Sequence, residues 1–566
     1  MSTRIKKIRL RDFIIVPILL TGLANFDASA QSKSTKTTTK KTQKKTTTKP
    51  AAKSKVKATT NSFATRPAPP KAAAPVSSGS SNPQLQRQIQ VSLNQIRGGQ
   101  YVAAANGLLA LSRRADMAAD KAQIKYFLGV ALMELSLNQV ASFQFVDVIR
   151  SGDTKYLKQS LEKLLIVTDR LGDETLLNFA LQRIDVTSIP EKHRDMLYFR
   201  MGEIQQKGGN HQEAVQSYLR VANSSRYFLN SLYNLGSTYA ESGQLNQALS
   251  TFKKLYNARQ SAGVTDTNRV SSQMGIARVL YQQQKWDDSV EAYAEIPRDH
   301  RLWHDSIFER SWAMLRSGRF RSALSNFHSL HSSYYDDFYI PESLLLRSIV
   351  YLYICKYEEM EKVLGLYDKQ YNPVESRIAN FLKTRTLAES YYAEVEKAIQ
   401  HKRSPKSNIK LEIPIKALNH ISEEGDVRRM TAYIRKVQEE RLKIERNSQI
   451  KSSSLGSYST RLLSNRIKNA KVSTGEMIKA HMQNMLSELK DLKDQTALIR
   501  YEMINGKKET IKKRIIGKSL DEGAVEEETR DRSFYVQNGY EYYPFQGEYW
   551  LDEIGNYHYL GKQSCE

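Results

Sequence analysis

Histidine and cysteine are the residue types in this sequence best suited to bind a metal ion or to act as a nucleophile, and their spacing supports neither chemistry. The histidines of the central region are the candidates: His211, His300, His304, His328 and His331. None belongs to an HExxH motif, the arrangement by which a helix presents two zinc ligands and a general base. His300 and His304 stand four residues apart beside Trp303, which favours packing or a surface position over a metal site.

The two cysteines, Cys355 and Cys565, form no CxxC pair. A structural zinc site and a thioredoxin-like motif are therefore excluded on ligand count, while a disulfide between the two cysteines remains open. The sequence has neither a GxxxxGK[ST] phosphate-binding loop nor a GxSxG nucleophile motif. We therefore expect a protein that is not an enzyme and that uses no cofactor and no metal ion.

The first thirty residues have the three parts of an export signal. Five basic residues lie between Arg4 and Arg11, a short apolar run extends from Phe13 to Leu23, and residues 28–30 read Ala-Ser-Ala. Signal peptidases cut after small residues in this position, so we expect cleavage after Ala30. The apolar run reaches only about 16 Å as a helix, against a hydrocarbon core of about 30 Å. The mature chain is expected in the periplasm or associated with the cell envelope.

Residues 31–82 form a basic segment rich in Lys, Thr, Ser, Ala and Pro. It holds twelve Lys and Arg and no acidic residue, and so carries about half of the chain's net charge of +25. Such a composition cannot bury enough apolar surface to fold, so we expect a disordered linker. Downstream of an export signal, its basic charge could meet an anionic cell-wall polymer or membrane surface, although a spacer without affinity is favoured. We expect no specific nucleic-acid binding.

From residue 83 to 372 the sequence repeats with a period near 34. In the clearest unit, small residues stand where two helices of a hairpin touch, a glycine stands in the turn, and larger residues fill the groove to the next hairpin. These are Leu235, Gly236, Tyr239, Gly243, Ala248 and Phe252. Matching positions in neighbouring units include Gly202, Ala214, Gly318, Ala323 and Phe327. Residues 154–185 are helical in pattern and are expected to interrupt the register.

These spacings resemble the tetratricopeptide repeat (TPR) family. The resemblance implies an all-α solenoid whose concave face binds extended peptides or helices of partner proteins. The sequence departs from the family in two ways. Gln284 and Cys355 stand where the family has a turn glycine, and the family's proline after the second helix is mostly missing. A loop before the last units, containing Tyr334, Tyr335, Phe338 and Tyr339, is the candidate partner-binding site, since exposed aromatic residues beside carboxylates suit protein contacts. Packing over the edge of the solenoid is the favoured alternative.

Residues 373–530 change to long helices of the coiled-coil kind. Apolar residues alternate by three and four from Val427 to Ile444, and again from Ile478 to Met503. Each stripe needs a partner. An intramolecular hairpin that reverses near Lys451–Ser459 is favoured, and a parallel homodimer is the rival.

Residues 531–566 form an aromatic C-terminal segment, with Gly residues between alternating aromatics. This pattern predicts a small β-hairpin or an aromatic clasp folded onto the helices. The stretch GEYWLDEIGNY at 547–557, joined to TPR units and an export signal, resembles TPR envelope proteins of gliding and predatory bacteria, some of them linked to gliding motility. The sequence therefore predicts a non-enzymatic envelope scaffold that binds proteins. The alternative is a cell-wall protein that holds peptidoglycan or other glycans with its basic linker and aromatic tail.

Overall fold

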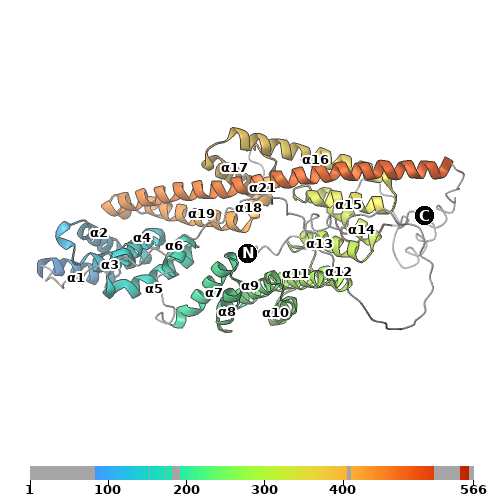
Figure 1. Cartoon of the computed structure of the whole chain (residues 1–566). Coiled ribbons are helices and arrows are strands. Elements are labelled where there is room, and N and C mark those ends of the chain that lie inside the picture. The colour runs from blue at the N-terminus through green and yellow to red at the C-terminus, as the bar shows by residue number, and fades with distance from the viewer. Residues whose placement is uncertain are drawn as a thin grey trace, which may run out of the picture. The chain divides into compact units, whose positions relative to one another are not determined.

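The computed structural model describes residues 83–151, 153–172, 174–181, 191–404, 409–515 and 549–559 (Figure 1). Every regular element in these ranges is a helix, which confirms the prediction of an all-α chain. The predicted export signal, the basic linker and most of the aromatic segment lie outside the described residues. No helix in the described ranges is both long and apolar enough to cross a membrane.

Helices α1 to α16 are arranged as consecutive hairpins, in which each first helix packs against the second. The N-terminal hairpins are α1 (Pro83–Arg97) with α2 (Tyr101–Ser112), α3 (Lys121–Glu134) with α4 (Asn138–Ser151), and α5 (Thr154–Leu171) with α6 (Glu174–Leu181). The next are α7 (Glu191–Lys207) with α8 (His211–Leu219), and α9 (Phe228–Glu241) with α10 (Leu245–Ala258). The last are α11 (Thr267–Gln282) with α12 (Trp286–Ala294), α13 (Trp303–Arg316) with α14 (Phe320–Leu330), and α15 (Pro341–Tyr353) with α16 (Tyr357–Thr384).

Each hairpin turns through one residue with a positive φ, the left-handed conformation that glycine adopts without steric cost. Five of the eight turns use glycine: Gly99, Gly172, Gly209, Gly243 and Gly318. The other three use Ser136, Gln284 and Cys355, with φ between 55° and 63°. Gln284 and Cys355 therefore occupy the turn position despite their side chains, as the spacing requires.

Within a hairpin, a residue without a side chain faces an aromatic ring sixteen residues later. A Cβ atom added to Gly202 would lie 2.5 Å from the Tyr218 ring, and one added to Gly236 would lie 2.9 Å from Phe252. Gly129 meets Phe145 in the same way. Of the residues predicted to pack the repeats, Ala214, Leu235, Ala248, Phe252, Ala323 and Phe327 are buried, and Tyr239 is partly buried.

Residues 154–185 do not interrupt the register as expected. Helices α5 and α6 pack together as a hairpin, and Gly172 with φ 76° stands 36 residues after Ser136 and 37 before Gly209. The interruption was inferred from leucines that do not match the repeat pattern. These leucines are compatible with the hairpin, because α5 buries Leu161, Leu164 and Leu165 against neighbouring helices.

The remaining helices are α17 (Ala388–Arg403), α18 (Ile415–Glu423), α19 (Gly425–Arg446), α20 (Ser448–Lys451) and α21 (Ser454–Ile515). The stripe from Ile478 to Met503 is buried along α21, whose main helical partners within the chain are α15, α16, α17 and α19. The helices α19 and α21 pack together as an intramolecular hairpin, the favoured alternative. The chain reverses at Asn447–Ser453, slightly before the predicted Lys451–Ser459, because α21 already begins at Ser454. The boundary expected at 372–373 falls inside α16, which continues through Pro373 because Tyr371, Val374 and Ile378 are buried along one side of it.

Candidate functional site on helices α13 and α14

The loop between α14 and α15 holds the four aromatic residues proposed for partner binding, and the structure divides them. Tyr334 and Phe338 are 50% and 44% exposed. Tyr335 is half-buried, and Tyr339 is buried, with its ring centroid 5.8 Å from that of Tyr371. Burial raises the pKa of Tyr339 well above its ordinary value. Tyr334 and Phe338 can therefore meet a partner, whereas Tyr339 belongs to the packing.

The histidines beneath this loop are packing residues. His304 is 4% exposed and stacks on Phe338 with ring centroids 4.0 Å apart. Burial lowers its pKa to about 3, so the ring is neutral. His331 pairs with the hydroxyl of Ser343 at 2.9 Å. In the described ranges, no group of three His, Cys, Asp or Glu side chains is placed to hold a metal ion.

Residues 549–559, from the C-terminal aromatic segment, lie directly on this surface. The backbone N–H of Gly555 donates to Ser329 Oγ at 2.8 Å, and that of Tyr559 donates to Ser325 Oγ at 2.9 Å. Arg298 donates from Nη1 to the backbone oxygen of Asp552 at 2.8 Å. These residues form a turn and no strand, so this part of the segment is a clasp and not a β-hairpin.

Two features of the tail fit its side chains to the surface. Ile554 is 1% exposed, and a Cβ atom on Gly555 would lie 2.9 Å from the Trp303 ring. His328 lies between two tail rings, with centroids 5.1 Å from Tyr549 and 4.4 Å from Tyr557. Burial, and secondarily the charge of Arg347, lower the pKa of His328 to about 4.

The sequence did not identify Ser325, Ser329 and Arg298 as binding residues. Ser325, His328 and Ser329 are three and four residues apart, so they lie on one face of α14. Ala323 and Phe327, the buried repeat positions, lie on the other side of the helix. A polar stripe on the outer face of one repeat was the available signal, but such a stripe is typical of any solvated helix.

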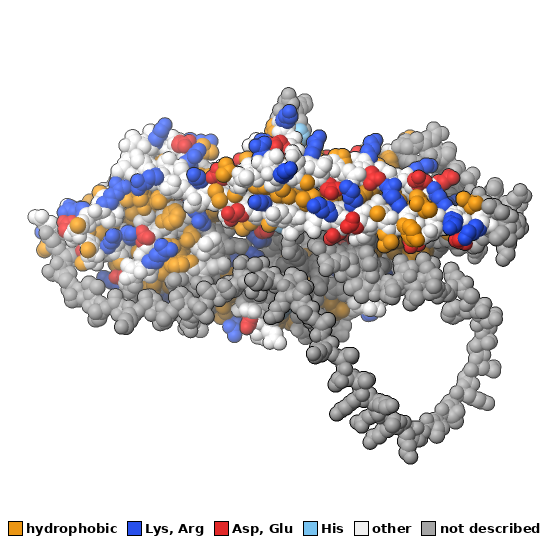
Figure 2. Space-filling view, turned by 45° about the horizontal axis from the view of Figure 1, so that its top comes forward, with side chains coloured by type: hydrophobic (Ala, Val, Ile, Leu, Met, Phe, Trp, Pro, Cys, Tyr) orange, Lys and Arg blue, Asp and Glu red, His pale blue; other side chains and the backbone are white. Residues whose placement is uncertain are grey.

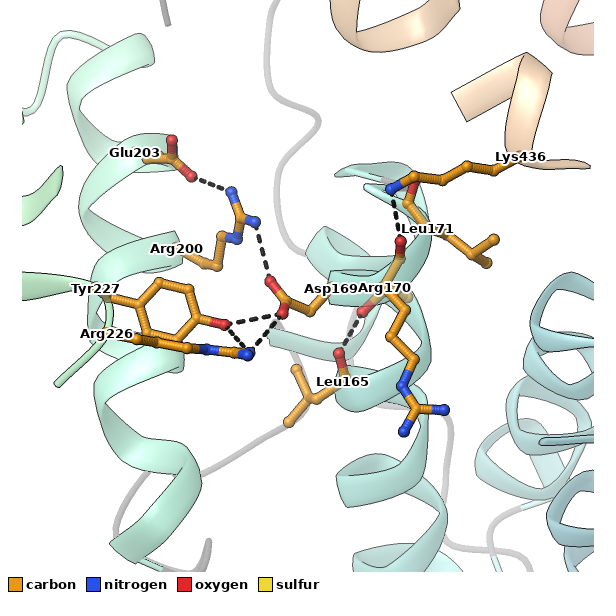
Figure 3. A network of polar contacts seen from close by, with 10 residues as sticks. Leu165, Asp169, Arg170, Leu171, Arg200, Glu203, Arg226, Tyr227 and Lys436 are labelled. Carbon is orange, nitrogen blue, oxygen red and sulfur yellow. Dashed lines mark hydrogen bonds and ion pairs between the residues drawn. The ribbon is translucent and has the colours of Figure 1, made fainter. Parts of the chain in front are cut away.

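A second cluster of polar contacts joins the N-terminal hairpins to the repeats that follow (Figure 3). Asp169 at the end of α5 accepts from Arg200 at 3.0 Å, from Arg226 at 3.1 Å and from the Tyr227 hydroxyl at 2.8 Å. Arg200 also bonds Glu203 at 2.6 Å. Burial opposes the charged form of Arg200, but the two carboxylates outweigh it and raise its pKa.

The same end of α5 contacts the C-terminal helices. Lys436 on α19 donates to the backbone oxygens of Arg170 at 2.6 Å and Leu171 at 3.3 Å (Figure 3). A cation at this position complements the negative end of the α5 helix dipole. The end of α5 is therefore a joint between the N-terminal hairpins, the middle repeats and α19.

The described surface carries charges of both signs. Figure 2 shows Lys and Arg side chains interspersed with Asp, Glu and apolar side chains on the face it presents. Ion pairs such as Arg500–Asp368 and Lys507–Glu361 join α21 to α16. The described part of this face therefore offers no continuous basic track of the kind a polyanion backbone follows.

Two family models match the chain, both described as tetratricopeptide repeat, at residues 197–225 and 229–261. The second range spans α9 and α10, and the first spans α8 and the second half of α7. The chain therefore contains TPR repeats, and the TPR-type helical solenoid predicted from the spacing is confirmed. A search of curated proteins finds no match.

Solved structures of other proteins also match parts of the chain. A tetratricopeptide repeat protein from Parabacteroides merdae is 16% identical, over 51% of this chain and 94% of the other, with a TM-score of 0.22. A Rap protein complexed with competence and sporulation factor is 12% identical, over 63% and 99%, with a TM-score of 0.29. The TPR domain of P58(IPK) is 12% identical, over 68% and 99%, with a TM-score of 0.18. None of these comparisons supports the resemblance to proteins of gliding and predatory bacteria.

Proposed function

We propose that this chain is an exported, non-enzymatic scaffold that binds partner proteins through its TPR array. The observation that supports the proposal is the run of hairpins with TPR packing, because stacked repeats create extended surfaces that bind peptides or helices of other proteins. The absence of a nucleophile motif or phosphate-binding loop from the sequence is consistent with this role.

The binding surface is assigned to the first helices of the hairpins. Asn230 on α9 and Ser271 on α11 each precede the small residue of their repeat, Gly236 and Ala277, by six positions. Both side chains are partly exposed. Equivalent positions in successive hairpins lie in a row, so a ligand can contact several repeats at once.

Photo-crosslinking in the native cell tests this assignment. A photoreactive residue at Asn230 or at Ser271 of the full chain is expected to give a discrete protein adduct. The matched control is Lys253, which is exposed on the second helix of the α9–α10 hairpin. Adducts of equal yield from all three positions, or none from the first helices, would contradict the assignment.

Export is the second part of the proposal, supported by the basic, apolar and small-residue parts of residues 1–30. N-terminal mass spectrometry of the protein from its host is expected to find a chain that begins at Gln31 in the periplasmic or envelope fraction. A chain that begins at Met1 or Ser2 in the cytosol would refute it. Membership of a motility or envelope-spanning complex is the finer proposal, tested by proximity labelling from the same fraction.

Cell-wall binding is the alternative, favoured by the twelve basic residues of 31–82. The described part of the tail supports it less, because Tyr549 and Tyr557 pack on His328. Co-sedimentation with purified cell-wall sacculi separates the two functions. Binding that is lost on deletion of residues 31–82 would favour the alternative, and binding that is unchanged would refute it as stated.

A further inference from the structure

The contacts of residues 549–559 with the solenoid are those of a peptide with its receptor. All three polar contacts with Ser325, Ser329 and Arg298 use backbone atoms of the tail. Other N–H groups of the segment are used within it: Asn556 donates to the Glu553 oxygen at 2.8 Å, and Trp550 donates to the Tyr557 hydroxyl at 3.1 Å. Recognition through the backbone fixes a segment's position without demanding its full sequence.

The specificity lies in a short stretch of side chains. Ile554 is inserted and 1% exposed, Gly555 has a φ of 93° and lies against Trp303, and Tyr557 meets His328. A ligand for this surface therefore needs an aliphatic residue followed by glycine in a tight turn, with an aromatic residue two positions later.

The hairpin beneath the tail is complete without it. Ala323 and Phe327 of α14 are 0% exposed, and they lie away from the stripe that Ser325, His328 and Ser329 form. Loss of the tail would uncover the hydroxyl groups of Ser325 and Ser329 and the rings of Trp303 and His328. Groups of these types are common on protein surfaces. The core of the repeat does not need the segment.

The tail also leaves large apolar side chains exposed. Trp550 and Leu551, on the turn next to Ile554, are 57% and 61% exposed. A permanent part of the core would bury such large apolar residues. Contact through few buried side chains is what an exchangeable ligand shows.

We propose that the outer face of α14 and the start of α13 form a peptide-binding site, which residues 549–559 occupy as a ligand in cis. A partner protein binds there by presenting the same chemistry, an aliphatic-glycine turn followed by an aromatic residue, and it displaces the tail. The inference rests on the proposed scaffold function and adds a regulated second site to the first-helix surface.

A labelled synthetic peptide of residues 549–559 tests the site. Ile554→Asp in the full chain removes the inserted side chain from the cis ligand and leaves the receptor surface intact. This variant is expected to bind the peptide, measured by fluorescence anisotropy. A reductant is present because Cys355 is disulfide-bonded and Cys565, in the tail, is the only other cysteine of the chain. The wild-type chain should bind it at least about ten-fold more weakly, because a tethered ligand competes at a high effective concentration.

Two matched controls identify the surface. Adding Ser325→Ala and Ser329→Ala to the Ile554→Asp chain should weaken peptide binding, whereas adding Ser250→Ala, an exposed serine on α10, should not. A peptide with Gly555→Ala should fail to bind. Equal peptide binding by the wild type and the Ile554→Asp chain would overturn the proposal. Peptide binding that stays unchanged when both serines are replaced would overturn it too.

Two further outcomes are distinguishable. Light scattering could find that the wild-type chain dimerises and that Ile554→Asp abolishes the dimer. This result would show that the ligand is the tail of a second copy and not a partner protein, and it would overturn the assignment. Crosslinks from Asn230 and Ser271 with no peptide binding at α14 would refute this site alone. Peptide binding without those crosslinks would refute the first-helix surface alone.

Discussion

Glu440 on α19 closes the N-terminus of α4. Both of its carboxylate oxygens accept the backbone N–H of Gln139 at 3.0 Å, although the two residues are 301 positions apart. The side-chain oxygen of Gln139 in turn accepts from the Tyr433 hydroxyl at 2.8 Å. The first N–H groups of a helix have no acceptor within the helix. A side chain from a distant helix can therefore accept a hydrogen bond from the N-terminus of α4 and at the same time hold α19 against α4.

This contact predicts a pH dependence. Burial raises the pKa of Glu440 to about 8, against a smaller lowering by the Gln139 amide. The folded state therefore holds the proton more tightly than the unfolded chain, whose carboxyl titrates near 4.5. The stabilising contribution is complete below pH 4.5 and is lost as the pH rises toward 8, by about 1.4 kcal/mol for each unit between the two pKa values.

Glu440→Gln, which stays neutral, should therefore have a higher Tm than wild type at pH 8 and a similar Tm at pH 4.5. Thermal unfolding across this range measures the difference, with the exposed neighbour Glu439→Gln as control. A variant destabilised equally at every pH would show that the contact needs the carboxylate charge.

Asp169→Asn should loosen the joint at the end of α5. The side chain of Asp169 is 14% exposed and that of Arg200 is 25% exposed, so Arg200 would lose a partially buried counter-charge, at a cost of about 1–3 kcal/mol. Urea unfolding and hydrogen exchange in α5 and α7 measure the effect. Asp116→Asn breaks the exposed pair with Arg114, with side chains 49% and 45% exposed, and should change almost nothing. Equal effects of the two variants would mean that the joint adds no stability.

Gly475→Ala should destabilise the packing of α17 on α21. The added Cβ would lie 1.8 Å from the backbone oxygen of Ala388, so one helix would have to shift, at a cost of about 2–3 kcal/mol. Gly365→Ala is the control, because nothing lies within 4 Å of that position on α16. It should be neutral or stabilising by up to about 1 kcal/mol through helix propensity. The Tm values of the two variants show whether steric contact or helix propensity decides the effect of an added Cβ atom on stability.

Gln284→Gly should stabilise the α11–α12 turn. Gln284 has a φ of 63°, a conformation that costs a residue with a Cβ atom about 1–2 kcal/mol, offset in part by the greater chain entropy of glycine. The net gain expected from denaturant unfolding is about 0.5–1 kcal/mol. The reciprocal change Gly243→Gln, at φ 79° in the preceding hairpin, should lower stability. Loss of stability in both variants would show that Gln284 makes a compensating contact.

Docking of the tail should weaken in acid. Burial, and secondarily the charge of Arg347, lower the pKa of His328 from 6.5 to about 4. The rings of Tyr549 and Tyr557 contribute to that burial, so protonation of His328 favours the undocked state. Docking is complete above pH 6.5 and declines as the pH falls toward 4. Hydrogen-exchange protection of residues 549–559, corrected for intrinsic rates, measures it. His328→Gln should remove the dependence, and a pH profile unchanged in that variant would assign the effect to another group.

The repeat pattern was readable because its contacts are local. Gly236 meets Phe252 sixteen residues later, and the same spacing recurs at Gly202 and Tyr218. The turn at Ser136 was missed because a serine stands where the repeat has a glycine, and the hairpin of α5 and α6 was missed because its leucines do not match the repeat pattern. A left-handed φ is forced on Ser136 by the hairpin around it, so its side chain gives no signal.

The candidate site was predicted in part. The aromatic loop at 334–339 does lie beside the tail surface, but Tyr339 faces inward onto Tyr371, because an aromatic residue in a loop gives no sign of which way it points. The serines of α14 were missed since they resemble any solvated helix face. Their role depends on a segment more than 220 positions later.

The sequence by itself determined that this protein is a series of helical hairpins followed by long helices with apolar stripes. It could do so because each hairpin buries a stripe against residues at a fixed, short distance along the chain. Only the tertiary structure decided that the stripe of α21 is covered within the chain, that Asp169 and Glu440 join distant helices, and that residues 549–559 rest on α14. Such contacts link residues that share no periodic spacing, so nothing in the order of the amino acids marks them until the helices have packed.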